Sequence, residues 1–316
     1  MNYAPPIDLG GVVLLDTHHE GYDRTIGAFL VPLEGGAFFL VETGPGSTLS
    51  RLREGIRTAG FELDGLQKIF VTHIHLDHAG AAGQLSRETG AVVVVHRRGA
   101  PHLVDPSRLL ASAGRLYGDA MGRLWGDVVP VLEERIEIVE GGETLTVDNR
   151  TLRVLYTPGH ASHHVCFLLD DGSLFTGDAA AIRLPGSEVI RPAVPPPEID
   201  LELWEMSIDA MRAVGAERLM LTHFGEVTEV DSHLATVPRK NRHWAEEVLN
   251  GLHAGDSQEV LEARIVALSR NELVKGGALG DVIARHAVSS DARLTVMGLT
   301  RYWRKHHPER IEESTP

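Results

Sequence analysis

The segment from His73 to His78, with the sequence HIHLDH, carries three histidines and one aspartate within six residues. It follows residues 68–72 (KIFVT), an apolar, β-branched run that predicts a buried strand. Because side chains alternate between the two faces of a strand, His73, His75 and Asp77 are expected to point the same way. Leaving so much polarity unpaired there would be costly. The segment therefore predicts a metal site with imidazole and carboxylate ligands.

Two groups of short β segments, separated by glycine-rich turns, predict two sheets. The expected strands are 12–15, 27–31, 37–42, 68–72 and 91–96 in the first group, and 135–139, 143–147, 152–156, 164–169, 173–176 and 218–222 in the second. Helices are expected at 48–59 and 79–89. This pattern favours two sheets packed face to face and covered by helices. A generic mixed α/β domain is the alternative that periodicity alone leaves open.

Three further stretches differ from this pattern. Residues 97–126 predict a helical insertion, extending to about 130, and residues 183–200 carry five prolines, which indicates a stiff, extended loop. Beyond about 236 the β signals end, and helices are expected at 238–253, 257–269, 277–287 and 290–306. We expect a catalytic domain over 1–235 and a helical C-terminal extension over 236–316.

The charge and cysteine content restrict the classes of function. The 30 basic and 44 acidic residues give a net charge of −14, which argues against unspecific binding to nucleic acid or anionic membranes. The single cysteine, Cys166, allows no intrachain disulfide and no thiolate-rich zinc site. With neither a secretory signal at the N-terminus nor an apolar run of the ~20 residues that a membrane span needs, we expect a soluble, cytoplasmic protein.

The sequence resembles the metallo-β-lactamase superfamily, whose signature is H-x-H-x-D-H after a buried strand. Three more segments resemble elements of that family in its order: TPGH at 157–160, FTGD at 175–178 and THFG at 222–225. Residues 42–44 (ETG) resemble its early D-T-G element, with Glu42 where aspartate is usual. The resemblance covers roughly residues 12–230 and implies an α/β fold, the αββα sandwich of two mixed sheets covered by helices.

The resemblance also implies a dinuclear site with two divalent metal ions. Zinc is the expected metal, with iron or manganese as alternatives. One metal would be held by His73, His75 and His160, the other by Asp77, His78 and His223, with Asp178 bridging them. A hydroxide shared by the two metals would be the nucleophile, and Asp77 would take or return the proton.

Four residues are candidates for the substrate pocket. Tyr117 and Trp125 in the helical insertion are expected to form its wall, with ordinary helix packing as the alternative. Arg183, after Asp178, is a candidate for contact with an anionic substrate group, and a surface arginine is the alternative. His163 is a candidate for the pocket lining, although a solvent-facing or core histidine is the more common case.

The expected function is hydrolysis of a small-molecule ester, thioester or lactone. The alternatives are an iron-dependent oxidoreductase of the same fold, and a phosphodiesterase or nuclease. Residues 301–307 (RYWRKHH) combine cations with aromatics, but in a chain of charge −14 they are better explained as the charged end of a helix. We therefore expect a small-molecule substrate and neither nucleic acid nor membrane as partner, and the helical tail is a candidate element for a homodimer.

Overall fold

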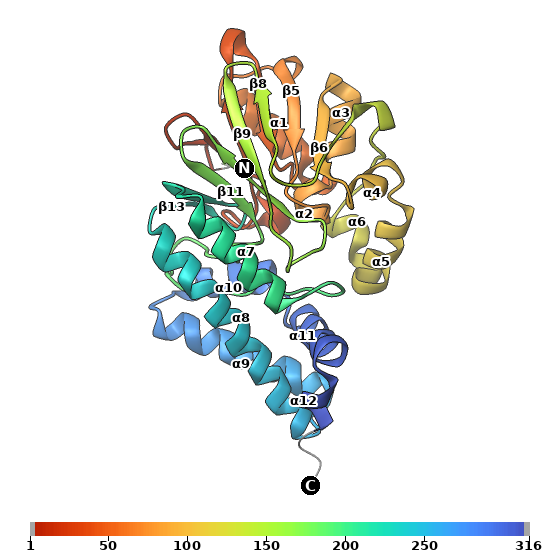
Figure 1. The fold of residues 1–316 in the computed structure, drawn as a ribbon, viewed down its shortest axis with the longest axis vertical. Helices are drawn as coiled ribbons and strands as arrows, with labels where there is room; N and C mark the ends of the chain where they lie inside the picture. The colour runs from red at the N-terminus through yellow and green to blue at the C-terminus, as the bar shows by residue number, and fades with distance from the viewer. Residues whose placement is uncertain (1–3, 313–316) are drawn as a thin grey trace.

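The computed structural model describes residues 4–312 and contains two β-sheets (Figure 1). The first sheet has the order β1-β2-β3-β4-β5-β6-β7. Its strands are β1 Ile7–Asp8, β2 Val13–Asp16, β3 Gly27–Pro32, β4 Phe38–Val41, β5 Leu66–Phe70, β6 Val92–His96 and β7 Ile136–Val139. The second sheet has the order β13-β12-β11-β10-β9-β8. Its strands are β8 Thr144–Val147, β9 Arg150–Tyr156, β10 Val165–Leu169, β11 Ser173–Gly177, β12 Arg218–Leu221 and β13 Gly225–Val227. Both sheets are mixed, because β4, β5, β6 and β7 pair in parallel and so do β11 and β12.

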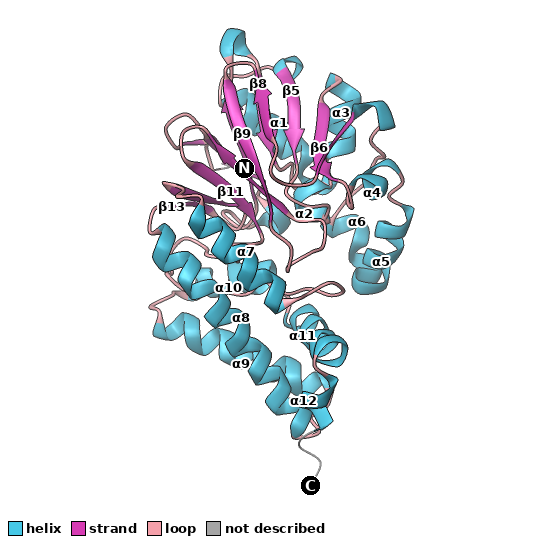
Figure 2. Ribbon diagram, viewed as in Figure 1, coloured by secondary structure: helices cyan, strands magenta, loops and turns pink. Residues whose placement is uncertain are grey.

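Helices cover the sheets, and those from the C-terminal part of the chain form the lower half of the molecule in Figure 2. They are α1 Leu49–Thr58, α2 Leu76–Ala79, α3 Ala82–Thr89, α4 Ala100–Val104, α5 Ser107–Tyr117, α6 Met121–Leu124, α7 Leu201–Ala213, α8 Val230–His253, α9 Gln258–Lys275, α10 Gly280–Ser289, α11 Ala292–His306 and α12 Pro308–Glu312. No helix within residues 4–312 is both long and apolar enough to cross a membrane.

The central strands β3 and β4 of the first sheet are buried on both faces, and alternation along them divides their side chains between two cores. Phe29 and Phe39 face the second sheet, where Phe29 contacts Phe175 with ring centroids 5.3 Å apart. Leu30 and Phe38 point the opposite way, into the core beneath the helices that cover the first sheet. The expected αββα sandwich is confirmed.

Each expected strand has a counterpart, but two strands were missed and one argument was wrong. β1 and β13 are too short to give a periodic signal. β5 ends at Phe70, so His73 and His75 lie in the loop that follows it, and Asp77 lies in α2. Strand alternation therefore does not align these side chains. The loop and the short helix bring them together instead.

The C-terminal helices pack against the sandwich. α8 begins at Val230, before the expected start at 238, and has Pro238 in its interior. Proline favours the first turn of a helix, but Leu234 and Val237 are fully buried in the core between the sheets and the helices, and this packing extends the helix toward its N-terminus. The division expected at 235/236 falls inside α8 and stays a prediction.

Candidate metal centre

The candidate ligands gather where strands of both sheets end. His160 follows β9, Asp178 follows β11 and His223 follows β12. These three strands run in the same direction, because β9 and β11 are both antiparallel to β10 while β11 and β12 are parallel. Their C-terminal ends therefore lie at one edge of the second sheet, facing the loop after β5.

Two glycines permit the close approach of these loops. Gly177 has φ 48°, and a Cβ there would collide with the side chains of Thr72 and His164. Gly159 has φ 132°, and a Cβ there would collide with Trp204. Positive φ is readily adopted only by glycine. The glycine before Asp178 and the one before His160 thus let the two ligand-bearing turns pack tightly.

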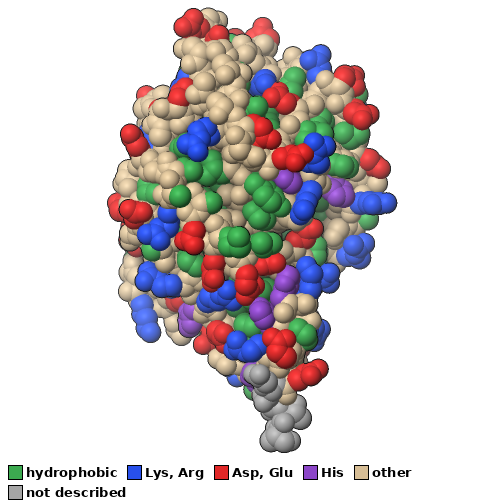
Figure 3. Space-filling model, viewed as in Figure 1, with side chains coloured by type: hydrophobic (Ala, Val, Ile, Leu, Met, Phe, Trp, Pro, Cys, Tyr) green, Lys and Arg blue, Asp and Glu red, His purple; other side chains and the backbone are tan. Residues whose placement is uncertain are grey.

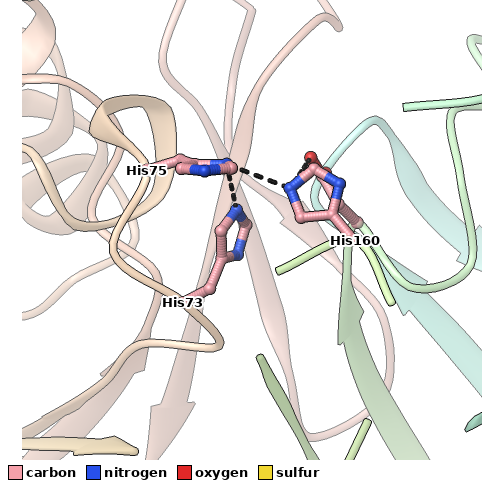
Figure 4. Close-up of side chains that lie close together, drawn as sticks. His73, His75 and His160 are labelled. Carbon is pink, nitrogen blue, oxygen red and sulfur yellow. Dashed lines mark hydrogen bonds and ion pairs between the residues drawn. The ribbon is translucent and has the colours of Figure 1, made fainter. Parts of the chain in front are cut away.

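Three histidines form the first group of candidate ligands (Figure 4). Nε2 of His73 and Nε2 of His160 each lie 3.0 Å from Nδ1 of His75. Nε2 of His160 also lies 3.4 Å from Oδ2 of Asp178. The facing atoms of these four side chains are close enough to bind one metal ion.

The second group consists of Asp77, His78 and His223. Oδ2 of Asp77 lies 3.6 Å from Nε2 of His78 and 3.4 Å from Nε2 of His223. The same two nitrogens each lie 3.3 Å from Oδ1 of Asp178. One oxygen of Asp178 therefore faces the first group and the other oxygen faces the second.

The spacing of these atoms fits metal ions. A tetrahedral ion with zinc–nitrogen distances of about 2.0–2.1 Å has ligand atoms about 3.3–3.4 Å apart. Nε2 of His78 and Oδ1 of Asp178 are buried and have no hydrogen-bond partner among residues 4–312. Buried polar atoms are normally paired, so these two atoms fit the ligands of a cation.

In three of the histidines, the ring nitrogen that does not face the cluster donates a hydrogen bond to a protein oxygen. Nδ1–H of His160 donates to the carbonyl of Ala193 and Nδ1–H of His223 to the carbonyl of Thr25, both at 2.7 Å. Nδ1–H of His78 donates to Oε1 of Glu42 at 3.1 Å. These hydrogen bonds leave the Nε2 lone pairs free for a metal and fix the orientation of each ring.

Glu42 holds a second ligand indirectly. The hydroxyl of Thr72 donates to Oε1 of Glu42 at 2.5 Å, and Nδ1 of His73 lies 3.1 Å from the same hydroxyl oxygen. Because that hydroxyl hydrogen is used on Glu42, Nδ1–H of His73 is the donor. The fully buried Glu42 therefore orients one ligand of each group, a role that the sequence left open because aspartate is usual at this position.

The histidine pKa values differ between the two ligand groups, because burial and neighbouring charges act on them differently. Burial and the surrounding imidazoles hold the pKa of His73 well below its usual range, and burial lowers the pKa of His75 to about 4. Burial alone would lower the pKa of His78 too, but Asp77 and Asp178 outweigh it and raise the pKa well above the usual range. The first group presents neutral nitrogen lone pairs, and the second stabilises positive charge.

A cavity of about 770 Å³ opens above the cluster, with His75, Asp77, Asp178 and His223 at its floor. The helical insertion contributes apolar and aromatic walls, including Leu109, Leu116, Tyr117 and Trp125. The Pro-rich loop contributes residues 193–197. The C-terminal extension completes the walls with residues of α9 and with residues 287–295. A volume of this size suits a small organic ligand.

The four substrate-pocket candidates divide into two pairs. Tyr117 and Trp125 both line the cavity, with ring centroids 5.0 Å apart. Arg183 is not among the lining residues, since its guanidinium pairs with Glu188 and lies 3.4 Å from Glu229. His163 does not line the cavity either. It lies behind the ligands, with its ring stacked 6.1 Å from that of His73.

Sequence reasoning missed two parts of the cavity. His19 lines it and stacks on Trp125 at a centroid distance of 5.5 Å. A lone histidine in a loop far from the metal motif gives no signal for such a place. The contribution of α9 and of residues 287–295 was also missed, because a helical pattern does not reveal which domain a helix packs against.

Comparison with known proteins gives the same fold and family. The sequence profile described as the metallo-beta-lactamase superfamily matches residues 28–223. The metallo-beta-lactamase fold-containing protein ST1585 of Sulfurisphaera tokodaii is 32% identical over 177 residues, which span 54% of this chain and 66% of that protein. The thioesterase pkgB of Emericella nidulans is 26% identical over 155 residues, or 46% of this chain and 36% of that protein. The chain thus matches just under two thirds of the first relative and about a third of the second.

Two solved structures share the fold at 24% sequence identity each. The archaeal superfamily protein ST1585 has a TM-score of 0.59, over 72% of this chain and 86% of that one. The metallo-beta-lactamase family protein TTHA1429 from Thermus thermophilus has a TM-score of 0.66, over 93% of both chains, so the likeness extends into the C-terminal helices. With the profile match over more than half its length, this chain belongs to the metallo-beta-lactamase superfamily.

Proposed function

We propose that this chain is a dinuclear metal-dependent hydrolase of a small-molecule ester, thioester or lactone. The superfamily consists mostly of metal-dependent hydrolases. The observation that carries the dinuclear assignment is the position of Asp178, whose two carboxylate oxygens face separate ligand groups. His73, His75 and His160 would hold one ion, Asp77, His78 and His223 the other, and Asp178 would contact both.

Zinc is the metal proposed, because imidazole and carboxylate at these distances suit it, and iron and manganese suit the same donors. Cys166 does not belong to the cluster, since its sulfur lies 3.3 Å from the Thr157 hydroxyl between the sheets. Two divalent ions held here would activate a water molecule as nucleophile and polarise the substrate carbonyl.

Asp77 is the proposed proton-transfer group. Its side chain is 23% exposed and lines the cavity, whereas the side chain of Asp178 is only 7% exposed. Burial would raise the pKa of Asp77, but His78 and His223 outweigh it and lower the pKa. Asp77 is therefore ionised at neutral pH, as a group that accepts a proton from water must be.

The cavity supports a small-molecule substrate. Its walls are mostly apolar, and a thioester, ester or lactone presents an apolar acyl group next to a reactive carbonyl. On the face drawn in Figure 3, acidic and basic side chains are interspersed rather than collected into a basic stripe. A nucleic-acid substrate would favour such a stripe.

The test combines metal analysis with a hydrolysis screen of thioesters, lactones, esters, phosphodiesters and β-lactams. We expect two equivalents of zinc per chain and turnover of a carbonyl substrate. Loss of that turnover on chelation and its return with added zinc would support the assignment. Stoichiometric iron with oxygen uptake, or turnover of phosphodiesters alone, would contradict it and favour the oxidoreductase or the phosphodiesterase.

A further inference from the structure

A second cavity lies beside the catalytic one. Its volume is about 750 Å³, and it is bounded by α5, the Pro-rich loop, α9 and α11. The two cavities share four lining residues, Ser112, Leu116, Pro196 and Pro197. These residues of the insertion helix and the Pro-rich loop form a wall common to both cavities, so the two cavities are adjacent.

Four cations surround the second cavity. Arg115 comes from α5, and Arg301, Arg304 and Lys305 come from α11. Arg301 donates from Nε to the carbonyl of Pro197 at 3.0 Å. Across the described residues, no carboxylate pairs with Arg115, Arg304 or Lys305 within 4.0 Å.

The acidic side chains nearby are engaged elsewhere. Asp256 is the one carboxylate among the described lining residues, and its Oδ2 lies 2.6 Å from Nε of Arg264. Glu198 accepts a hydrogen bond from the amide of Ser162 at 2.8 Å. Burial would raise the pKa of Glu198, but hydrogen bonds from Ser162, with a smaller contribution from Lys305, outweigh burial and lower the pKa. These carboxylates form no ion pair with Arg115, Arg304 or Lys305, so the positive charge of these three side chains is available to bind an anion.

The two cavities differ in electrostatic character. The catalytic cavity is lined by carboxylates such as Glu259 and Glu262 on α9, and Arg293 lies 3.5 Å from its neighbour Asp291. Away from the metal cluster, an anionic group therefore meets more cations in the second cavity than in the catalytic one. Arg115 lies in the last turn of α5, and Arg304 and Lys305 lie in the last turn of α11, where cations are favoured by the helix dipole. The C-terminal turns of two helices thus bring their cations to this one cavity.

α11 connects the two cavities. Its residue Thr295 lines the catalytic cavity and its residue Arg304 lines the second one. At 1.5 Å per residue these positions lie about 14 Å apart along the helix axis. A ligand with its carbonyl at the metal cluster and its anionic end among the cations must be elongated.

We propose that the second cavity binds the phosphate groups of a thioester substrate whose thiol part is phosphorylated, as in an acyl-coenzyme A. This inference rests on the proposed hydrolase function and narrows its substrate class. The acyl group would lie against the apolar wall residues of the catalytic cavity. In the reaction, oxygen from water bonds to the acyl carbon, the C–S bond breaks and the thiol leaves with a proton, which gives a carboxylic acid and free coenzyme A.

The first test measures binding without turnover, by calorimetry with coenzyme A and with pantetheine, which lacks its phosphates and its adenosine. The variant is Arg304→Ala/Lys305→Ala, and the matched control is Arg270→Ala/Lys275→Ala, two exposed cations on α9 that line neither cavity. We expect coenzyme A to bind at least tenfold more weakly to the variant than to the wild type or the control. Equal affinity for coenzyme A and pantetheine, or the same loss in the control, would overturn the inference.

The second test measures hydrolysis by the zinc-loaded protein of one acyl group carried by coenzyme A or by pantetheine. We expect the variant to raise KM for the coenzyme A thioester at least tenfold and to leave kcat/KM for the pantetheine thioester unchanged. Added salt should raise KM only for the phosphorylated substrate. Equal kcat/KM for both thioesters in the wild type would overturn the inference and leave the hydrolase standing. Binding of coenzyme A without any thioester turnover would support the anion subsite but contradict the proposed function.

Discussion

The floor and the walls of the catalytic cavity are built in different ways. The floor consists of strand ends and adjoining turns, where Glu42 and backbone carbonyls hold the candidate ligands by their second nitrogen. The walls consist of helices from the insertion and from the C-terminal extension, held mainly by apolar packing. Hydrogen bonds fix direction whereas apolar contacts fix only proximity. The floor is thus suited to holding metal ligands in a fixed geometry, and the walls are suited to selecting the substrate.

The strongest test of this comparison is removal of the carboxylate between the two ligand groups. Asp178→Ala should abolish binding of both metals and reduce hydrolysis at least about 10³-fold, because the metals contribute several kcal/mol to the transition state. Metal content and kcat measured on the same sample check this. Asp209→Ala, at an exposed site on α7, is the control. Retention of both metals by the Asp178 variant would contradict the bridging role.

A smaller effect is expected from Glu42→Gln, which preserves the shape of the side chain but weakens the hydrogen bonds that it accepts from Thr72 and His78. Loss of such an outer partner typically costs about 10–100-fold in metal affinity. We expect that loss in a chelator competition assay, with activity recovering at higher zinc concentration. A variant whose activity falls at full metal occupancy would instead place Glu42 in contact with the reaction.

The wall supplied by the extension is tested through His286, which is fully buried. The guanidinium of Arg191, in the Pro-rich loop, donates to its carbonyl at 2.8 Å. Burial, helped by Arg191 and Arg285, lowers the pKa of His286 to about 3. The unfolded chain therefore takes up this proton near pH 6.5, whereas the folded chain does so only near pH 3, and stability falls as pH decreases below 6.5.

Lowering the pH from 6.5 to 5 should reduce the free energy of unfolding by about 1.5 kcal/mol through His286 alone, which corresponds to a fall of about 3 °C in Tm. His286→Leu should reduce the fall in Tm over that interval by this amount, measured by thermal denaturation with the metals removed. His243→Leu, at a more exposed ring on α8, is the matched control. An unchanged slope in the His286 variant would show that the extension is not coupled to pH through this site.

The smallest effect is expected at a single wall position. Val266 on α9 lines the catalytic cavity and is 55% exposed, whereas Val274 on the same helix is 56% exposed and lines neither of the two cavities. Val266→Ser should raise KM for an apolar acyl substrate about fivefold through about 1 kcal/mol of lost apolar contact. Metal content and kcat should not change, and Val274→Ser should match the wild type. A fall in metal content would contradict the division between floor and walls.

The candidate ligands were foreseeable because their signals are local. HIHLDH and the later TPGH, FTGD and THFG segments each end a strand or follow one closely, and in the structure their side chains meet. The mechanism expected for the first segment was wrong, since β5 ends at Phe70 and a loop with a short helix aligns His73, His75 and Asp77. The residue types, more than the strand geometry, carried the prediction.

The sequence by itself determined the two sheets, most strand positions, the helical insertion and the set of side chains able to bind metal, because hydrophobic periodicity and short motifs are properties of neighbouring residues. Only the tertiary structure decided that Asp178 faces both ligand groups, that Glu42 orients His73 and His78, and that Arg183 and His163 lie outside the cavity. It also brought α5, the Pro-rich loop and α11 around a second, cationic cavity. These contacts join residues about 30 to 200 positions apart, and such pairings are fixed by the packing of whole elements rather than by any local pattern.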